Sequence, residues 1–253
     1  MPELDLTGKV AVVTGGSRGL GRQMSLAFAR HGATVVVASR KADACAVTAE
    51  EITRETGQEA IGLGCHVGDW AQCDALADAV YERFGRVDVL VNNAGASPLY
   101  PSLAEISEEL WDKVLAVNLK GAFRLSALIG TRMAAGDGGS IINISSIGSI
   151  APSAHELPYA AAKAGLNSLA GGMARAFAPH VRVNTIVAGT FLTDISKAWD
   201  MDAFERFAET RIPLQRGGRP EEIVGTALYL ASDVSSYTNG AAIVIDGGMT
   251  SSR

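Results

Sequence analysis

The chain has 253 residues, of which 47% are hydrophobic and 19% are charged. This composition supports a sizeable buried core and argues against a disordered protein. The net charge of −5 argues against nucleic acid or an anionic membrane surface as the main partner.

Seven short runs rich in valine and isoleucine alternate with longer helical patterns. The runs lack strict alternation of polar and apolar residues, which is the pattern of strands buried on both faces. Repeated strand–helix–strand units predict right-handed crossovers and a parallel sheet. The expected strands are 9–14, 33–39, 60–67, 87–92, 140–145, 181–187 and 241–246. Because no linker or repeat interrupts them, we predict that residues 1–253 form a single doubly wound α/β domain, with a seven-stranded sheet and helices on both faces.

The first expected strand is followed directly by a glycine-rich turn and a helix. Glycines let the backbone approach a pyrophosphate, and the free amides at a helix N-terminus bind the anion. The residues expected to hold the cofactor phosphates are Gly15, Ser17, Arg18, Gly19, Leu20 and Gly21. In the helix, the repeat of Leu20, Met24 and Phe28 indicates one buried stripe, which ends at Gly32.

Two later segments have distinct patterns. Asp69 is expected to cap the helix that follows the third strand. Segment 189–219 has scattered charges, prolines and glycines, which is typical of a lid or binding loop. The apolar residues of this segment predict a pocket for bulky ketones or their secondary alcohols rather than free sugars. These apolar residues are Phe191, Leu192, Ile195, Trp199, Met201, Phe204 and Phe207.

Three motifs in register resemble the short-chain dehydrogenase/reductase family over essentially the whole chain. They are the T-G-x-x-x-G-x-G turn, the Asn-Asn-Ala-Gly sequence at 92–95, and Tyr159-x-x-x-Lys163. The resemblance implies a Rossmann-type sheet, a nicotinamide cofactor, and hydride transfer between a carbonyl and an alcohol. It also implies a homo-oligomer, either a dimer or a homotetramer, and the small residues after Tyr159 would suit close helix packing.

The catalytic residues are expected to be Asn118, Ser146, Tyr159 and Lys163. Tyr159 and Lys163 are four residues apart, so they share one face of a helix. A phenol has an ordinary pKa of about 10, and a nearby ammonium should lower that pKa. The resemblance implies that Lys163 also holds the nicotinamide ribose, that Ser146 rather than Ser145 polarises the carbonyl, and that Asn118 holds a water in a proton relay.

The expected cofactor is NADP(H). A Rossmann fold that selects NAD offers a carboxylate near the end of the second strand, where it binds the ribose 2′-hydroxyl. This chain instead has Ser39, Arg40 and Lys41, and Arg18 could close on a 2′-phosphate from the glycine turn.

The remaining cofactor contacts follow from the resemblance, with two departures. His66-Val67 stands where the family often has Asp-Val, which puts the adenine contact in doubt. Ala188-Gly189 replaces Pro-Gly, which frees the backbone there. The complete expected set is Gly15, Ser17, Arg18, Gly19, Leu20, Gly21, Ser39, Arg40, Lys41, His66, Val67, Asn93, Ala94, Gly95, Tyr159, Lys163, Gly189 and Thr193.

Substrate contacts are expected from Ser97, Ile147, His155, Leu157 and Phe191, and the histidines and acids show no metal-ligand pattern. The leading hypothesis is therefore an NADP(H)-dependent carbonyl reductase or alcohol dehydrogenase. Two alternatives remain open: a 3-oxoacyl thioester reductase, which would need a basic patch for its carrier, and a nucleotide-sensing Rossmann protein without catalysis. Enoyl reduction is disfavoured, because that branch spaces its Tyr and Lys more widely.

The expected location is the cytoplasm. Three cysteines without CxxC spacing fit a reducing compartment and argue against a disulfide framework or a cysteine zinc site. The N-terminus is acidic and has no apolar signal sequence, and no uncharged apolar run reaches the roughly 18 residues of a membrane helix.

Overall fold

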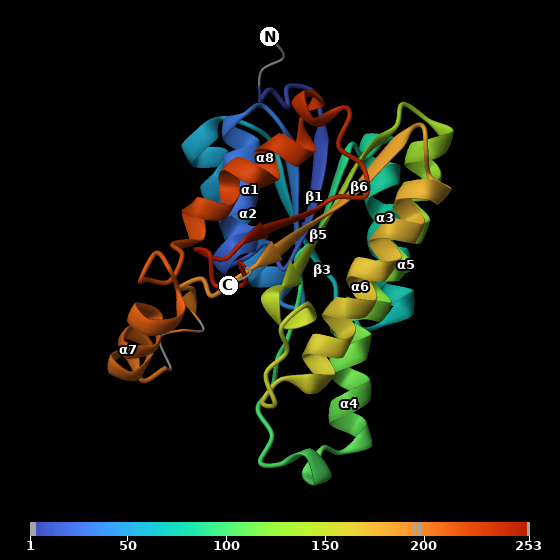
Figure 1. The fold of residues 1–253 in the computed structure, drawn as a ribbon. Helices are drawn as coiled ribbons and strands as arrows, with labels where there is room; N and C mark the ends of the chain where they lie inside the picture. Colours follow the sequence, from blue (N-terminus) through green and yellow to red (C-terminus); the bar gives the residue numbers. More distant parts are fainter. Residues whose placement is uncertain (1–3, 195, 197–198, 252–253) are drawn as a thin grey trace.

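One parallel sheet organises the structure (Figure 1), a computed structural model that describes residues 4–194, 196 and 199–251. The strand order is β3-β2-β1-β4-β5-β6-β7, and every neighbouring pair is parallel. The strands are β1 Val10–Thr14, β2 Thr34–Ser39, β3 Ala60–Gly64, β4 Val89–Asn92, β5 Gly139–Ser146, β6 Val181–Ala188 and β7 Ala242–Ile245. The predicted seven-stranded Rossmann-type sheet is confirmed. β3 is shorter than expected, because His66 and Val67 lie beyond its end.

Helices cover both faces of this sheet (Figure 1). One face packs against α1 (Gly19–Arg30), α2 (Ala42–Thr56) and α8 (Val224–Ala231), and the other against α3 (Trp70–Phe84), α5 (Gly121–Ala135) and α6 (Leu157–Ala176). In β1, alternate side chains enter the two cores: Ala11 and Val13 on one side, Val10 and Val12 on the other. This two-sided burial explains the uninterrupted apolar runs.

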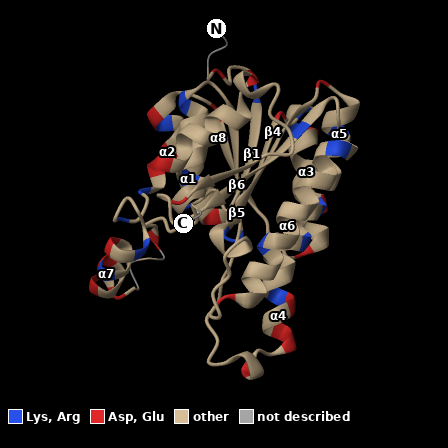
Figure 2. Ribbon diagram, viewed as in Figure 1, with Lys and Arg blue, Asp and Glu red and all other residues tan. Residues whose placement is uncertain are grey.

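Charged residues lie mainly in the helices and loops, whereas the strands are almost free of them (Figure 2). The predicted helix ends are also present. The Asp69 carboxylate accepts a hydrogen bond from the Gln72 amide at the start of α3 (3.1 Å). Gly32 follows α1 with φ of +94°, a conformation in which glycine avoids the steric cost of a side chain.

The stretch 108–135 contains α4 (Glu108–Leu115), a π-helical turn (Ala116–Lys120) and α5. Within the described chain, it is the helical segment that is long and apolar enough to cross a membrane by length and composition. Leu125, Ile129 and Met133 are buried in one of the two cores that flank the sheet. Its apolar character is thus explained in part by packing inside the domain.

The segment 189–219 is more regular than expected. Its ends are joined, because the Gly218 amide donates to the Thr190 carbonyl and the Leu192 amide donates to the Gly218 carbonyl (2.9 and 2.8 Å). Between them lies α7 (Met201–Arg211), whose first turn is capped by Asp200. The interpretation of this segment as irregular is therefore wrong at α7, which projects from the body of the domain (Figure 1). Ile195, one of the expected lid residues, lies outside the described residues.

Candidate active site

The carboxyl ends of β1, β4, β5 and β6 meet at one edge of the sheet, where open α/β sheets bind their ligands. The glycine turn follows β1, Asn93 follows β4, and Ser146 ends β5. Thr193 follows β6 and lies against the glycine turn, because a Cβ on Gly19 would stand 3.5 Å from the Thr193 side chain. The sheet thus gathers residues from four distant parts of the sequence.

The glycine turn has the shape of a phosphate cradle. Gly15 and Gly19 have φ of +64° and +53°, which favour glycine. At Gly21, a Cβ would lie 2.3 Å from the Gly15 carbonyl oxygen, so the helix could not pack this closely with any larger residue. No side chain caps the N-terminus of α1. Its first amides can therefore bind a pyrophosphate, and the residues present fit a dinucleotide.

The turn after β4 holds the glycine turn in place. The Asn93 amide nitrogen donates to the Thr14 and Gly15 carbonyls (2.9 and 3.2 Å). The Thr14 hydroxyl accepts hydrogen bonds from the backbone amides of Asn93 and Ala94 (3.0 and 3.1 Å). These bonds fix the two turns to each other. They engage the Asn93 side chain and the backbone amides of Asn93 and Ala94.

Replacing Gly21 with alanine should test this packing. The new methyl group meets backbone rather than a flexible side chain, so we expect a loss of about 1–3 kcal/mol of folding free energy together with weaker NADPH binding. Gly225→Ala is the matched control, because Gly225 is exposed in α8 and a Cβ there meets nothing within 4 Å. Urea denaturation and fluorescence titration measure both effects. A Gly21→Ala protein as stable and as tight-binding as the Gly225→Ala protein would contradict the packing.

The expected 2′-phosphate site lies at the end of β2. The Ser17 hydroxyl donates to the Ser39 hydroxyl (3.0 Å), which also contacts the Cys45 thiol (3.0 Å). Arg18 and Arg40 are exposed beside this pair. Two hydroxyls at the strand end and exposed cations around them form a neutral-to-positive surface, with no carboxylate at the position that would select NAD.

The other expected cofactor residues have structural contacts. The His66 ring nitrogen Nδ1 accepts from the Gly68 amide (3.1 Å), and the His66 amide donates to the Gln72 side chain (2.9 Å). Val67 is buried against Gly121 at the start of α5, where a Cβ would stand 2.0 Å from the Val67 oxygen. Gly189 packs closely against Asp246, because a Cβ on Gly189 would lie 2.6 Å from the Asp246 Cα. The loop after β3 is therefore firmly bonded with His66 in place.

Tyr159 and Lys163 lie on α6 and face the end of β5. The Ser146 side chain lies within reach of the Tyr159 phenol and acts to lower its pKa. The Lys163 ammonium is 3% exposed, donates to the Ile144 carbonyl (2.8 Å) and lies 5.5 Å from the centre of the Tyr159 ring. Ser145 is buried instead, and its hydroxyl donates to the Lys163 carbonyl (3.4 Å). Of the two serines, Ser146 therefore contacts the phenol.

Burial controls the titration of both groups. It raises the pKa of Tyr159 to about 12, with a smaller opposing effect from the Ser146 hydrogen bond and a further increase from Glu156. Burial lowers the pKa of Lys163 to about 8. The prediction of a lowered Tyr159 pKa is wrong for this structure, because burial raises that pKa and the charge that acts on the phenol is the Glu156 carboxylate.

Asn118 lies in the π-helical turn between α4 and α5, and it is 1% exposed. Its amide nitrogen donates to the carbonyls of Ala96 and Val114 (2.8 and 2.9 Å), and its oxygen accepts from the Ala96 amide (3.1 Å). A Cβ on Gly95 would lie 3.0 Å from the Asn118 oxygen and 3.6 Å from the Lys163 nitrogen. Asn118 therefore fixes the chain that passes directly over Lys163.

The expected substrate residues do not all share one environment. Ser97 and His155 are exposed, whereas Ile147 and Leu157 are half-buried around Ser146 and Tyr159. Phe191 is 8% exposed and belongs to the core, with its ring close to Gly218. The Phe191 ring therefore packs in the core and against Gly218, which leaves little of it exposed to a substrate.

Tyr100 was not identified from the sequence. Its hydroxyl donates to the Ala154 carbonyl and accepts from the Leu157 amide (2.7 and 2.9 Å), so it ties the loop after Asn93 to the start of α6. Only its neighbourhood in space gives it this role. No periodic pattern or motif marks it.

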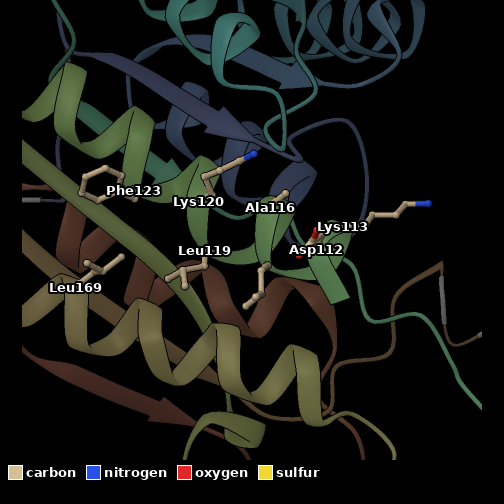
Figure 3. A pocket seen from close by; sticks show the side chains of 8 residues that line it. Asp112, Lys113, Ala116, Leu119, Lys120, Phe123 and Leu169 are labelled. Carbon is tan, nitrogen blue, oxygen red and sulfur yellow. The ribbon is translucent and has the colours of Figure 1, made fainter. Parts of the chain in front are cut away.

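A separate hollow lies between α4, the π-helical turn and α5 on one side and α6 on the other (Figure 3). Leu119, Phe123 and Leu169 supply its apolar surface, and Lys113 and Lys120 stand at its edge. None of its lining residues belongs to the expected catalytic set.

Comparisons with known proteins bear on the family. Residues 15–250 match the family model described as enoyl-(acyl carrier protein) reductase. The chain is 38% identical over 250 residues to a D-threitol dehydrogenase of Mycolicibacterium smegmatis, covering 97% of this chain and 94% of that one. It is 39% identical over 251 residues to an L-rhamnose 1-dehydrogenase (NAD(P)(+)) of Azotobacter vinelandii, covering 96% and 97%.

Among solved structures, a gluconate 5-dehydrogenase from Burkholderia cenocepacia in complex with NADP and tartrate has a TM-score of 0.93 and 33% identity, covering 99% of this chain and 98% of that one. Fold, motifs and full-length similarity agree. The chain belongs to the short-chain dehydrogenase/reductase family and is an oxidoreductase acting on CH–OH groups.

Proposed function

We propose that this chain is an NADP(H)-dependent oxidoreductase that interconverts a secondary alcohol and a carbonyl compound, with Tyr159 as the acid–base group. The observation that carries the proposal is the Ser146 side chain within reach of the Tyr159 phenol beside the buried Lys163, at the same sheet edge as the glycine turn. A phenol, a hydroxyl and an ammonium in this order suit proton transfer to a carbonyl oxygen.

Each side chain has one task in this proposal. Ser146 donates a hydrogen bond that orients and polarises the carbonyl, and the Tyr159 hydroxyl delivers the proton to the same oxygen. A pKa of about 12 keeps Tyr159 protonated at neutral pH, which is the form needed for reduction. In the opposite direction, Tyr159 must first lose its own proton, and the resulting phenolate then takes the proton of the alcohol. The nicotinamide supplies or accepts the hydride.

Lys163 and Asn118 act around this pair. The Lys163 ammonium lies beside the Tyr159 ring and under Gly95, where it can reach the ribose hydroxyls of a bound dinucleotide. The Asn118 side chain holds Ala96 at both its amide and its carbonyl. We therefore assign Asn118 a positioning role, with the proposed relay water as an additional function of the same turn.

The choice of NADP(H) rests on the end of β2. A carboxylate there would repel a 2′-phosphate, whereas Ser39 and the exposed Arg40, Lys41 and Arg18 offer hydrogen bonds and positive charge. Guanidinium groups bind phosphate oxygens in a two-pronged geometry, and such charge-assisted bonds are strong.

The test of this choice is kcat/KM with both cofactors in the wild type and in Ser39→Asp/Arg40→Ala. The wild type should prefer NADP(H), and the double variant should lose that preference by about 10- to 100-fold, as expected for a hydrogen-bonded charge. Arg54→Ala, on the exposed distal end of α2, is the control. Equal efficiency with both cofactors in the wild type would refute the assignment of Arg18 and Arg40.

The two alternatives have less support. Of the cations that a carrier protein could contact, Arg124 is paired with Asp74 and lies over Trp70, and Arg132 is paired with Asp78, so these two are not free for a carrier. A nucleotide sensor without catalysis would not need Ser146, Tyr159 and Lys163 in contact.

The substrate is proposed to be a small hydroxylated molecule. The similar proteins are named for threitol, rhamnose and gluconate, which favours this class over the bulky ketones expected from the apolar lid. Part of the apolar surface of segment 189–219 packs against itself, because the ring centres of Trp199 and Phe204 lie 5.5 Å apart.

We also propose a cytoplasmic homo-oligomer, either a dimer or a tetramer. The hollow beside α6, with exposed Phe123 and half-buried Leu119 and Leu169, offers an apolar surface to a second copy. Small residues on α6, including Gly171 and Gly172, leave room for close helix packing, because a Cβ at either position would meet nothing within 4 Å.

A further inference from the structure

Glu156 is a carboxylate beside the proposed catalytic pair that the catalytic steps do not use. It is the residue before α6, three positions ahead of Tyr159, and it is half-buried. Its charge acts on the Tyr159 phenol. No motif in the sequence marks Glu156, although its neighbours His155 and Leu157 are expected substrate contacts.

The Glu156 carboxylate lies against the turn that follows Ser146. A Cβ built on Gly148 would stand 2.7 Å from one Glu156 oxygen and 3.5 Å from the other. The Gly148 amide in turn donates to the Ser146 hydroxyl (3.1 Å). Glu156 and Ser146 therefore both lie against Gly148 at the carboxyl end of β5, close enough to Tyr159 for the Glu156 charge to act on the phenol.

This carboxylate is poorly compensated. It accepts one long hydrogen bond, from the Ser153 amide (3.5 Å), and burial raises its pKa above the ordinary range. Among residues 4–194, 196 and 199–251, no lysine or arginine forms an ion pair with it. A partly desolvated carboxylate with unused lone pairs is costly for folding and is typical of a functional site.

We propose that Glu156 selects neutral polyhydroxylated substrates, by accepting hydrogen bonds from hydroxyl groups next to the reacting carbon and by repelling anionic substrates. The inference rests on the proposed function and deepens it. Two oxygens of one carboxylate can accept bonds from two neighbouring hydroxyls, and hydrogen bonds to a charged oxygen are short and strong. A substrate carboxylate in the same place would face a like charge in a partly desolvated site.

The consequence is a separation within the substrate class. A neutral polyol or aldose fits beside Glu156, whereas a sugar acid does not. The similar proteins carry names of both kinds, threitol and rhamnose on one side and gluconate on the other. Glu156 assigns this chain to the neutral group.

The test is the ratio of kcat/KM for D-threitol to kcat/KM for D-gluconate, measured with NADP+ in the wild type and in Glu156→Gln. Glutamine keeps the size of the side chain and removes its charge. The wild type should favour D-threitol, and Glu156→Gln should lower the ratio by about 10- to 100-fold, the expected effect of losing hydrogen bonds to a charged group. L-rhamnose serves as a second neutral probe. Glu82→Gln, on the exposed face of α3, is the matched control.

Gly148→Ala provides a second variant that leaves residue 156 unchanged. Its methyl group would meet the Glu156 carboxylate and displace it, so the ratio should fall here as well. A ratio that changes less than about threefold in both variants would overturn the inference.

The inference about Glu156 and the proposed function are tested by different results. A wild-type enzyme that oxidises simple secondary alcohols but neither neutral probe would overturn the inference while keeping the proposed function. Inactivity toward every secondary alcohol would reject the proposed function itself.

Discussion

Replacing Tyr159 with phenylalanine should lower kcat by about 100- to 10,000-fold, the range that general acid–base catalysis contributes. Phenylalanine keeps the ring that packs beside the Lys163 ammonium and removes only the hydroxyl, which lies within reach of the Ser146 side chain. The Kd for NADPH should remain within about threefold of wild type, because no proposed cofactor bond depends strongly on that hydroxyl. Stopped-flow kinetics and fluorescence titration measure the two quantities.

Tyr229→Phe is the matched control for this substitution. Tyr229 is also half-buried and its hydroxyl is also bonded, to Thr238 (2.6 Å), but it lies on α8 outside the proposed site. A Tyr159→Phe enzyme that keeps more than a few per cent of wild-type turnover would show that the acid–base role has been given to the wrong residue.

Replacing Lys163 with methionine should weaken catalysis and change the pH dependence of stability. Loss of the ammonium should lower kcat by about 100-fold or more and raise the Kd for NADPH by about tenfold or more, because a charge-assisted bond to the ribose is removed. Turnover and fluorescence titration report these losses. An effect on turnover alone would remove the ribose role from Lys163.

The stability effect has a defined sign. Burial lowers the pKa of Lys163 from 10.5 to about 8, so the unfolded chain binds this proton more tightly than the folded one. Below about pH 8 the buried charge of Lys163 therefore lowers the free energy of unfolding of the wild type. This destabilisation is lost as the pH rises toward 10.5. Methionine has no such cost at any pH.

Raising the pH from 7 to 10.5 should therefore stabilise the wild type relative to Lys163→Met. The expected gain in unfolding free energy is about 2–4 kcal/mol. Comparing the same two proteins across pH cancels the constant loss of the hydrogen bond to Ile144. A difference that does not vary with pH would mean that Lys163 is solvated rather than buried.

The strands and the family motifs could be predicted because their signals are local. Runs such as Val10–Thr14 are apolar at every position, since both faces of the sheet are covered. Gly15 and Gly21 were recognisable because backbone conformation and close approach exclude other residues there. The cap at Asp69 likewise depends only on residues within one helical turn.

What the sequence could not predict depends on packing between distant segments. The direction of the Tyr159 pKa shift follows from its burial, which i, i+4 spacing cannot reveal. Phe191 was assigned to the substrate surface from its place after the sixth strand, but its pairing with Gly218 buries it. Glu156 is adjacent to the site only because Gly148 leaves room for its carboxylate.

The helix α7 was missed for another reason. Its few apolar side chains are interrupted by charges, and α7 has a single buried residue, Ala208. Its apolar residues Met201, Phe204 and Ala208 do recur at helical spacing, but the prolines and glycines that follow them favour a loop. The capping residue Asp200 was the local signal that could have identified its start.

The most direct test of the whole account is the oxidation of a panel of secondary alcohols, D-threitol among them, with NADP+ or NAD+, followed by the appearance of the reduced nucleotide. The account predicts that the wild type reduces NADP+ more efficiently than NAD+ with at least one alcohol, and that Tyr159→Phe protein binds NADP+ but forms almost no product. A wild-type protein that binds NADP+ tightly yet reduces it with no alcohol, and oxidises NADPH with none of the matching ketones, would contradict it.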